Sequence, residues 1–61
     1  MRNPARIYKI CVEIAQLWAE KCPDWRFCQL MDNFFSYKRS DCFYVEDEDF
    51  IAELKKFLET L

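Results

Sequence analysis

The residue type with the most distinctive chemistry in this chain is cysteine, which occurs four times, as Cys11, Cys22, Cys28 and Cys42. So many thiols in 61 residues are typical of a disulfide framework or of a metal site. No two of them form a C-x-x-C pair, and without histidine only an all-thiolate site of unusual spacing is available. We therefore expect reduced thiols that pack as small apolar side chains, with a disulfide or a metal site as the alternatives.

The lack of histidine also bears on catalysis. Histidine is the commonest general base, and it activates the nucleophile in Ser-His and Cys-His dyads. This chain can form none of these arrangements. We expect a protein that is not an enzyme and that needs no cofactor.

Acidic residues are concentrated toward the end of the chain. Residues 1–40 carry a net charge of +3 and residues 41–61 a net charge of −5, which together give the −2 of the whole sequence. A negative surface can bind a basic partner, and its candidate residues are Asp41, Glu46, Asp47, Glu48, Asp49 and Glu53. The alternative is that these acids only complement the positive end of a helix dipole. They lack the glycine and the ligand spacing of a calcium-binding EF-hand loop.

Trp25 and Tyr44 are candidates for a second partner-binding site, an aromatic patch, because exposed aromatic side chains often anchor protein interfaces. The alternative for Trp25 is that its indole folds back over the turn between two helices.

Nucleic-acid binding is a competing interpretation, and it depends on the following basic residues and tyrosines: Arg2, Arg6, Lys9, Arg26, Lys38 and Arg39, with Tyr8 and Tyr37. The isoelectric point of about 5.0 opposes it. A recognition helix would also need several basic or amide side chains on its outer face, whereas the second helix offers chiefly Gln29, Asp32 and Asn33 and the third is largely acidic there.

The elements that must position these residues are helices. The spacing of apolar side chains predicts an all-α fold with one domain, residues 1–61, and three helices at about 4–21, 24–37 and 47–60. Asn3 and Pro4 suit the N-cap and the first position of the first helix. Pro23 ends that helix, and Asp24 is the expected N-cap of the second.

Each predicted helix has an apolar stripe that should face a common core. The stripes consist of Ile7, Ile10, Cys11, Ile14, Leu17 and Trp18, then Phe27, Leu30, Met31, Phe34 and Phe35, and finally Phe50, Ile51, Leu54, Phe57, Leu58 and Leu61. The segment "CFYV", residues 42–45, is expected to lie against this core as an extended corner. Short connections predict an antiparallel arrangement of the helices.

Two segments, "LWAEKCPDWRFCQLMDNFF" and "DCFYVEDEDFIAEL", resemble a set of short, uncharacterised bacterial and phage-borne proteins. These proteins have a tryptophan, a PD-x-R-x-x-QL segment and an F-Y-aliphatic-E-D sequence before the last helix. The matching positions, within residues 7–58, are Trp18, Pro23, Asp24, Arg26, Gln29, Leu30, Phe43, Tyr44, Glu46 and Asp47. The resemblance implies no activity or site, only a small accessory protein of a mobile element.

We predict a small non-catalytic protein that binds another protein, as a phage or mobile-element accessory protein that modulates a host enzyme or defence complex. The alternatives are a nucleic-acid-binding regulator and a self-associating structural module. The sequence has no apolar run long enough for a membrane span and no uninterrupted apolar stretch at its start, so we expect a cytoplasmic protein. Because 61 residues enclose only a small interior, we also expect a homodimer that covers a surface patch drawn from Tyr8, Trp25, Met31, Phe43 and Tyr44.

Overall fold

The computed structural model describes residues 2–61 and consists of three helices, α1 (Ala5–Lys21), α2 (Phe27–Lys38) and α3 (Asp47–Leu58). The predicted all-α, three-helix fold is confirmed, and residues 2–61 contain no β-strand. The side-chain oxygen of Asn3 accepts a hydrogen bond from the N–H of Ala5 at 3.0 Å, but Pro4 rather than Asn3 occupies the N-cap position of α1, one residue later than expected. None of the helices in this part of the chain combines the length and the apolar character needed to cross a membrane.

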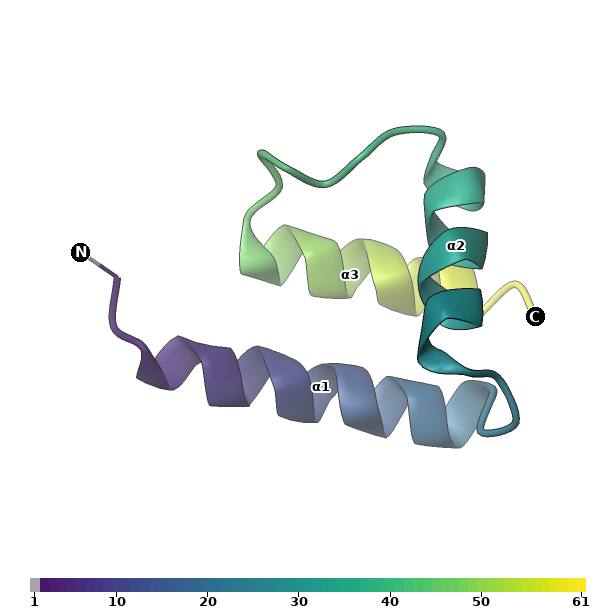
Figure 1. The fold of residues 1–61 in the computed structure, drawn as a ribbon, viewed down its shortest axis with the longest axis horizontal. Coiled ribbons are helices and arrows are strands. Elements are labelled where there is room, and N and C mark those ends of the chain that lie inside the picture. Colours follow the sequence, from purple (N-terminus) through teal and green to yellow (C-terminus); the bar gives the residue numbers. More distant parts are fainter. Residues whose placement is uncertain (1) are drawn as a thin grey trace.

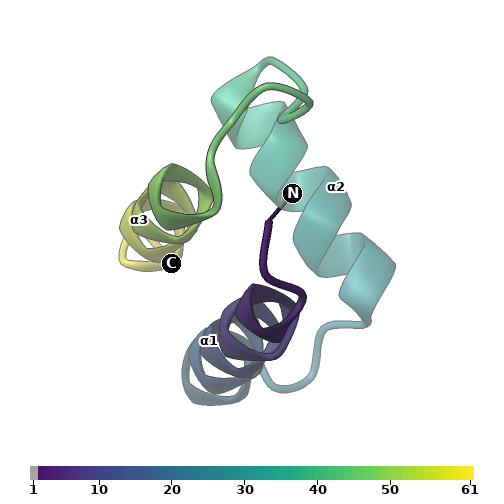
Figure 2. The same ribbon diagram turned by 90° about the vertical axis from the view of Figure 1, so that its left-hand side faces the viewer.

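An antiparallel three-helix arrangement would leave the first and third helices parallel, as they are here, so the structure departs from the expectation only at α2, which crosses the other two helices instead of running alongside them. Figure 1 shows α1 and α3 side by side and pointing in the same direction, with α2 crossing them at one end. Figure 2, in which α1 and α3 are seen almost end-on, shows the same crossing. The connection 39–46 leads from the far end of α2 back toward the end of the molecule where α1 begins, and this return makes α1 and α3 parallel.

The fully buried core is small, and α2 and α3 supply almost all of it: Cys22, Leu30, Phe34, Leu54, Phe57 and Leu58. The ring of Phe34 lies at its centre, with centroids 5.4 Å from Phe50 and 5.8 Å from Phe57. These aromatic pairs bring α2 onto α3, and α3 packs against α1 as well. Helix α1 contributes no fully buried side chain, and only part of its apolar stripe packs against the core.

The turn between α1 and α2 differs from the prediction at Asp24. The backbone N–H of Trp25 donates to the carbonyl of Cys22 at 3.1 Å, so residues 22–25 form a turn and α2 begins only at Phe27. The cap is instead made by Gln29, whose side-chain oxygen accepts from the N–H of Arg26 at 2.7 Å. The predicted start of this helix at residue 24, with Asp24 as its N-cap, is therefore wrong.

The segment "CFYV" is also not an extended corner. The N–H of Val45 donates to the carbonyl of Cys42 at 3.1 Å, which closes a β-turn with Phe43 and Tyr44 at its two central positions. Cys42 and Val45 are half-buried, whereas the rings of Phe43 and Tyr44 are in solvent. Only the ends of this segment pack on the protein, because a turn directs its central side chains outward.

Candidate functional site

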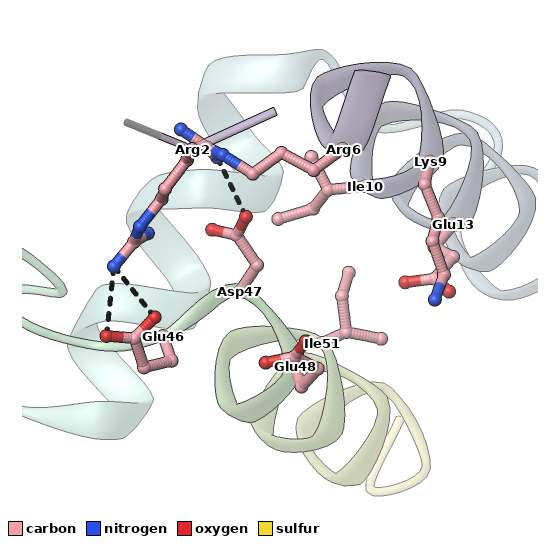
Figure 3. A pocket seen from close by; sticks show the side chains of 9 residues that line it. All are labelled: Arg2, Arg6, Lys9, Ile10, Glu13, Glu46, Asp47, Glu48 and Ile51. Atoms are coloured by element: carbon pink, nitrogen blue, oxygen red, sulfur yellow. Dashed lines mark hydrogen bonds and ion pairs between the residues drawn. The ribbon is translucent and has the colours of Figure 1, made fainter. Parts of the chain in front are cut away.

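Three of the predicted acids, Glu46, Asp47 and Glu48, line a groove between the N-terminal halves of α1 and α3. The groove has a volume of about 350 Å³. Figure 3 shows Ile10 of α1 and Ile51 of α3 between the two helices, with charged side chains around them. Two ion pairs cross the space: Arg2 to Glu46 at 3.0 Å and Arg6 to Asp47 at 2.9 Å.

These ion pairs follow from the parallel arrangement of the helices. Because α1 and α3 begin at the same end of the molecule, the basic residues that precede and open α1 lie beside the acids that open α3. The groove is lined by three basic and four acidic side chains, so its charges nearly cancel: Arg2, Arg6, Lys9, Glu13, Glu46, Asp47 and Glu48. Such a balance favours neither an anionic nor a cationic ligand, and it fits a contact between two helices.

Of the four predicted acids outside the ion pairs of the groove, Glu53 and Asp41 make hydrogen bonds within the chain, whereas Glu48 and Asp49 make no ion pair with residues 2–61. Glu53 accepts a hydrogen bond from Lys38 at 2.7 Å, which joins α3 to the end of α2 and raises the pKa of Lys38. Asp41 accepts from the N–H of Phe43 at 3.2 Å and so shapes the connection before α3. Glu48 and Asp49 are exposed and make no ion pair with any residue in 2–61. Three of the six predicted docking acids therefore pair with basic residues of the same chain.

The basic side chains are affected in the same way. Arg2, Arg6 and Lys38, which were candidates for phosphate contacts, are the partners of these three acids. Each would have to leave its carboxylate before it could bind a phosphate, which weakens the interpretation of the chain as a nucleic-acid-binding protein.

The aromatic candidates are on separate surfaces. Trp25 lies in the α1–α2 turn and Tyr44 in the α2–α3 connection, at opposite ends of α2 (Figure 1). Trp25 is half-buried against the core, and its carbonyl accepts a hydrogen bond from the indole N–H of Trp18 at 2.9 Å. The alternative in which Trp25 folds back over the turn matches this geometry, and the two residues do not form one patch.

The exposed aromatic surface is instead formed by Phe43 and Tyr44, which we call the aromatic turn. Phe43 is 80% exposed and Tyr44 90% exposed, and their ring centroids are 4.8 Å apart in an edge-to-face arrangement. Phe43 was expected on the dimer patch but not in the predicted aromatic partner-binding site, because an extended segment would place part of its surface on the core. The signal that could have located it is Asp41, which favours a turn two residues later.

All four cysteine thiols are free in the structure. Cys22 is in the core and Cys42 is half-buried, and burial raises the pKa of both thiols above its ordinary value, so both are neutral at physiological pH. Cys11 and Cys28 are exposed on α1 and α2. Within residues 2–61, no three cysteine or acidic side chains are grouped closely enough to hold a metal ion.

These features define a three-helix protein with an aromatic turn and with a charged, self-neutralised groove. No protein-family model matches the chain, and neither the curated proteins nor the solved structures contain a significant match to it.

Proposed function

We propose that the protein is a small non-catalytic module that binds another protein through the aromatic turn. The observation that carries the proposal is the exposure of two adjacent aromatic rings, Phe43 and Tyr44, which contact each other and project into solvent. Phenylalanine and tyrosine bury large apolar areas on binding and are common anchors at protein interfaces. An accessory protein of a mobile element, as the sequence resemblance implies, would bind a host protein in this way.

The backbone of the aromatic turn supports the proposal because it is already fixed. The N–H of Phe43 donates to the carboxylate of Asp41, and the N–H of Val45 donates to the carbonyl of Cys42, so both ends of the segment are held. A preorganised loop loses less conformational entropy on binding than a mobile one does. The backbone that carries the two rings therefore need not be ordered on binding, and only the exposed side chains lose freedom.

The choice of residues in the aromatic turn supports it as well. The central positions of β-turns usually hold glycine, proline, asparagine, aspartate or serine, and large aromatic residues are unusual there. Neither the core nor the turn geometry requires Phe43 or Tyr44. Residues that depart from local structural preferences without a packing benefit are characteristic of functional sites.

The charge near the aromatic turn defines the kind of partner. Asp41 lies at its start, and the exposed Glu48 and Asp49 lie just beyond its end, at the beginning of α3. The matching surface is an apolar pocket bordered by lysine or arginine side chains, which would accelerate association at low salt. This is a narrower form of the predicted acidic docking surface, because it omits the acids that are paired within the chain.

The experiment compares the wild-type protein with the double variant Phe43→Ala, Tyr44→Ala. Each is used to capture proteins from cells of the source organism, and the captured protein is then purified and titrated directly. We expect the double variant to bind at least about 100-fold more weakly while its circular dichroism and melting temperature stay unchanged. The matched control is Leu61→Ala, which removes another exposed large apolar side chain, outside the aromatic turn, and should bind as wild type does.

Equal binding by the folded double variant would contradict the proposal. Salt-dependent binding of duplex DNA by the wild-type protein would favour the nucleic-acid alternative instead. Charge reversal is best tested with Glu48→Lys, Asp49→Lys, because these acids make no ion pair within residues 2–61. Reversal of Glu46 and Asp47 would instead place lysines beside Arg2 and Arg6 and would reduce stability together with binding.

A further inference from the structure

Helix α1 has two apolar faces, although only one of them packs in the monomer. The inner face, which includes Ile10, Ile14 and Leu17, contacts the rest of the protein. The outer face is a second stripe at spacings of three and four residues, and all its members are exposed: Ala5, Tyr8, Val12, Ala15 and Ala19. In Figure 2, α2 and α3 both lie on one side of α1, so no other helix covers the opposite side.

The outer α1 face has the spacing of a coiled-coil seam. Apolar residues that alternate at intervals of three and four keep one helix in contact with another over several turns. Tyr8 is 76% exposed and Val12 is 53% exposed, so the rest of the chain leaves most of both side chains uncovered. A purely solvated helix face would carry charged residues at these positions.

The solvent-accessible surface of the chain can be compared with the value expected for a folded monomer of the same mass. A folded monomer of 7.5 kDa is expected to expose about 4,200 Å². This chain exposes 4957 Å², an excess of about 750 Å² over that expectation. A stable protein interface buries about 800 Å² on each partner, so the excess is close to what one such interface would remove.

We propose that the outer α1 face is the interface of a homodimer in which α1 packs antiparallel against α1 of a second copy. In an antiparallel pair centred between Val12 and Ala15, Tyr8 lies opposite the small Ala19 of the second copy, and Val12 lies opposite Ala15. Large side chains then face small ones in each of these layers, and Ala5 lies beyond them at the end of the seam. A parallel pair would set Tyr8 against Tyr8 and Ala15 against Ala15, with crowding at one layer and a void at the other.

The charged residues beside the seam are complementary to those of a second copy that packs antiparallel. Lys9, which also lines the edge of the α1–α3 groove, flanks the seam near its beginning, and Glu20 lies near its end on the same side of the helix. The antiparallel arrangement brings Lys9 of one copy near Glu20 of the other, twice by symmetry. This self-complementarity is what a two-fold symmetric interface requires, and it identifies a second copy as the occupant.

The proposal concerns a surface that is distinct from the aromatic turn, and it is tested on the complete protein without any partner. Sedimentation equilibrium and light scattering, at concentrations from about 1 to 500 µM, should show a mass that rises from 7.5 kDa to twice that value. A charge in the seam, introduced by Ala15→Glu, should weaken the dimer by at least about 100-fold. The matched control is Ala52→Glu, which places the same charge on an exposed position of α3 and should dimerise as wild type does.

A second pair of variants tests the orientation. Lys9→Glu should weaken the dimer, and the combination of Lys9→Glu with Glu20→Lys should restore it. If Ala15→Glu were unfolded by circular dichroism, Tyr8→Lys would replace it, since Tyr8 makes no core contact. A wild-type monomer at every concentration, or dimers that persist in the folded seam variant, would overturn the proposal. Failure of the double charge swap to restore association would exclude the antiparallel arrangement.

Discussion

The indole N–H of Trp18 donates a hydrogen bond to the backbone carbonyl of Trp25 at 2.9 Å, across the turn that joins α1 to α2. The carbonyl of Trp18 also accepts from the N–H of Cys22 at 3.0 Å, at the end of α1. A single residue thus fixes both the end of one helix and the path of the chain toward the next.

We expect Trp18→Phe to lower the free energy of unfolding by about 1 kcal/mol beyond its packing effect, because the carbonyl of Trp25 loses its half-buried donor. Urea denaturation followed by circular dichroism measures the change. Leu17→Met, a volume-conserving substitution on the same helix face, serves as the packing control and should cost less. Equal stability of Trp18→Phe and the wild type would show that the hydrogen bond makes no net contribution.

The cap of α2 provides a second prediction. Gln29→Ala should destabilise the protein by about 0.5 to 1 kcal/mol, since the N–H of Arg26 loses its acceptor. Gln29→Glu, which keeps the acceptor, should retain most of the stability. Asp24→Ala should change the unfolding free energy by less than about 0.5 kcal/mol, because Asp24 does not cap the helix. A larger loss of stability for Asp24→Ala than for Gln29→Ala would show that Asp24 caps the helix, as the sequence predicted.

The cap of α2, which Gln29 makes in place of Asp24, illustrates what the sequence can and cannot determine. Apolar residues repeated at intervals of three and four identified all three helices, because burial of one helix face depends mainly on local spacing. The start of α2 depends on whether the chain after Pro23 forms a turn before the helix, and this choice is made by contacts of Trp18 and Trp25 across that turn. Propensity alone favours Asp24 as a cap, so the boundary was predicted three residues too early.

The candidate site was less predictable than the helices. The ion pairs of Arg2 and Arg6 join residues more than 40 positions apart, and they depend on how α1 and α3 are aligned along their lengths, which helix periodicity does not specify. Exposure of Phe43 and Tyr44 depends on a turn whose central residues have little preference for turns. The width of the apolar sector on α1 was visible in the sequence, but only the packed structure shows which half of it is covered.

The end of α2 yields a third prediction. Arg39 has φ of 61° and ψ of 26°, the left-handed conformation that usually holds glycine after a helix, in a chain that contains no glycine. Arg39→Gly should therefore raise the free energy of unfolding by about 0.5 to 1 kcal/mol. Arg39→Ala, which removes the charge but keeps the Cβ atom, should bring no gain. Thermal and urea unfolding of both variants separate the backbone effect from the loss of charge.

Stability should decrease at alkaline pH. Burial raises the pKa of the Cys22 and Cys42 thiols above 9.0, and the hydrogen bond to Glu53 raises the pKa of Lys38 above 10.5. Each raised pKa favours the protonated form in the folded state. The stability from these groups is fully present below the unfolded pKa and is lost as the pH rises through the folded pKa.

The measurement is the melting temperature as a function of pH. We expect little change from neutral pH to about 9 and a progressive fall above it. The double variant Cys22→Ala, Cys42→Ala lacks both thiols, so its melting temperature should start lower but fall less steeply between pH 9.0 and 10.5. An identical slope in that interval would show that the thiols are not responsible.

The absence of any fully buried side chain on α1 has a consequence for how the protein opens. In native-state hydrogen exchange, the amides around Phe34 and Leu54 should exchange only by global unfolding, because these side chains form the core. The amides of α1 should exchange through a smaller opening, in which α1 detaches while α2 and α3 remain packed together. If two copies pair through α1, this detachment would have to break the pair first, so the protection of α1 alone would increase with protein concentration.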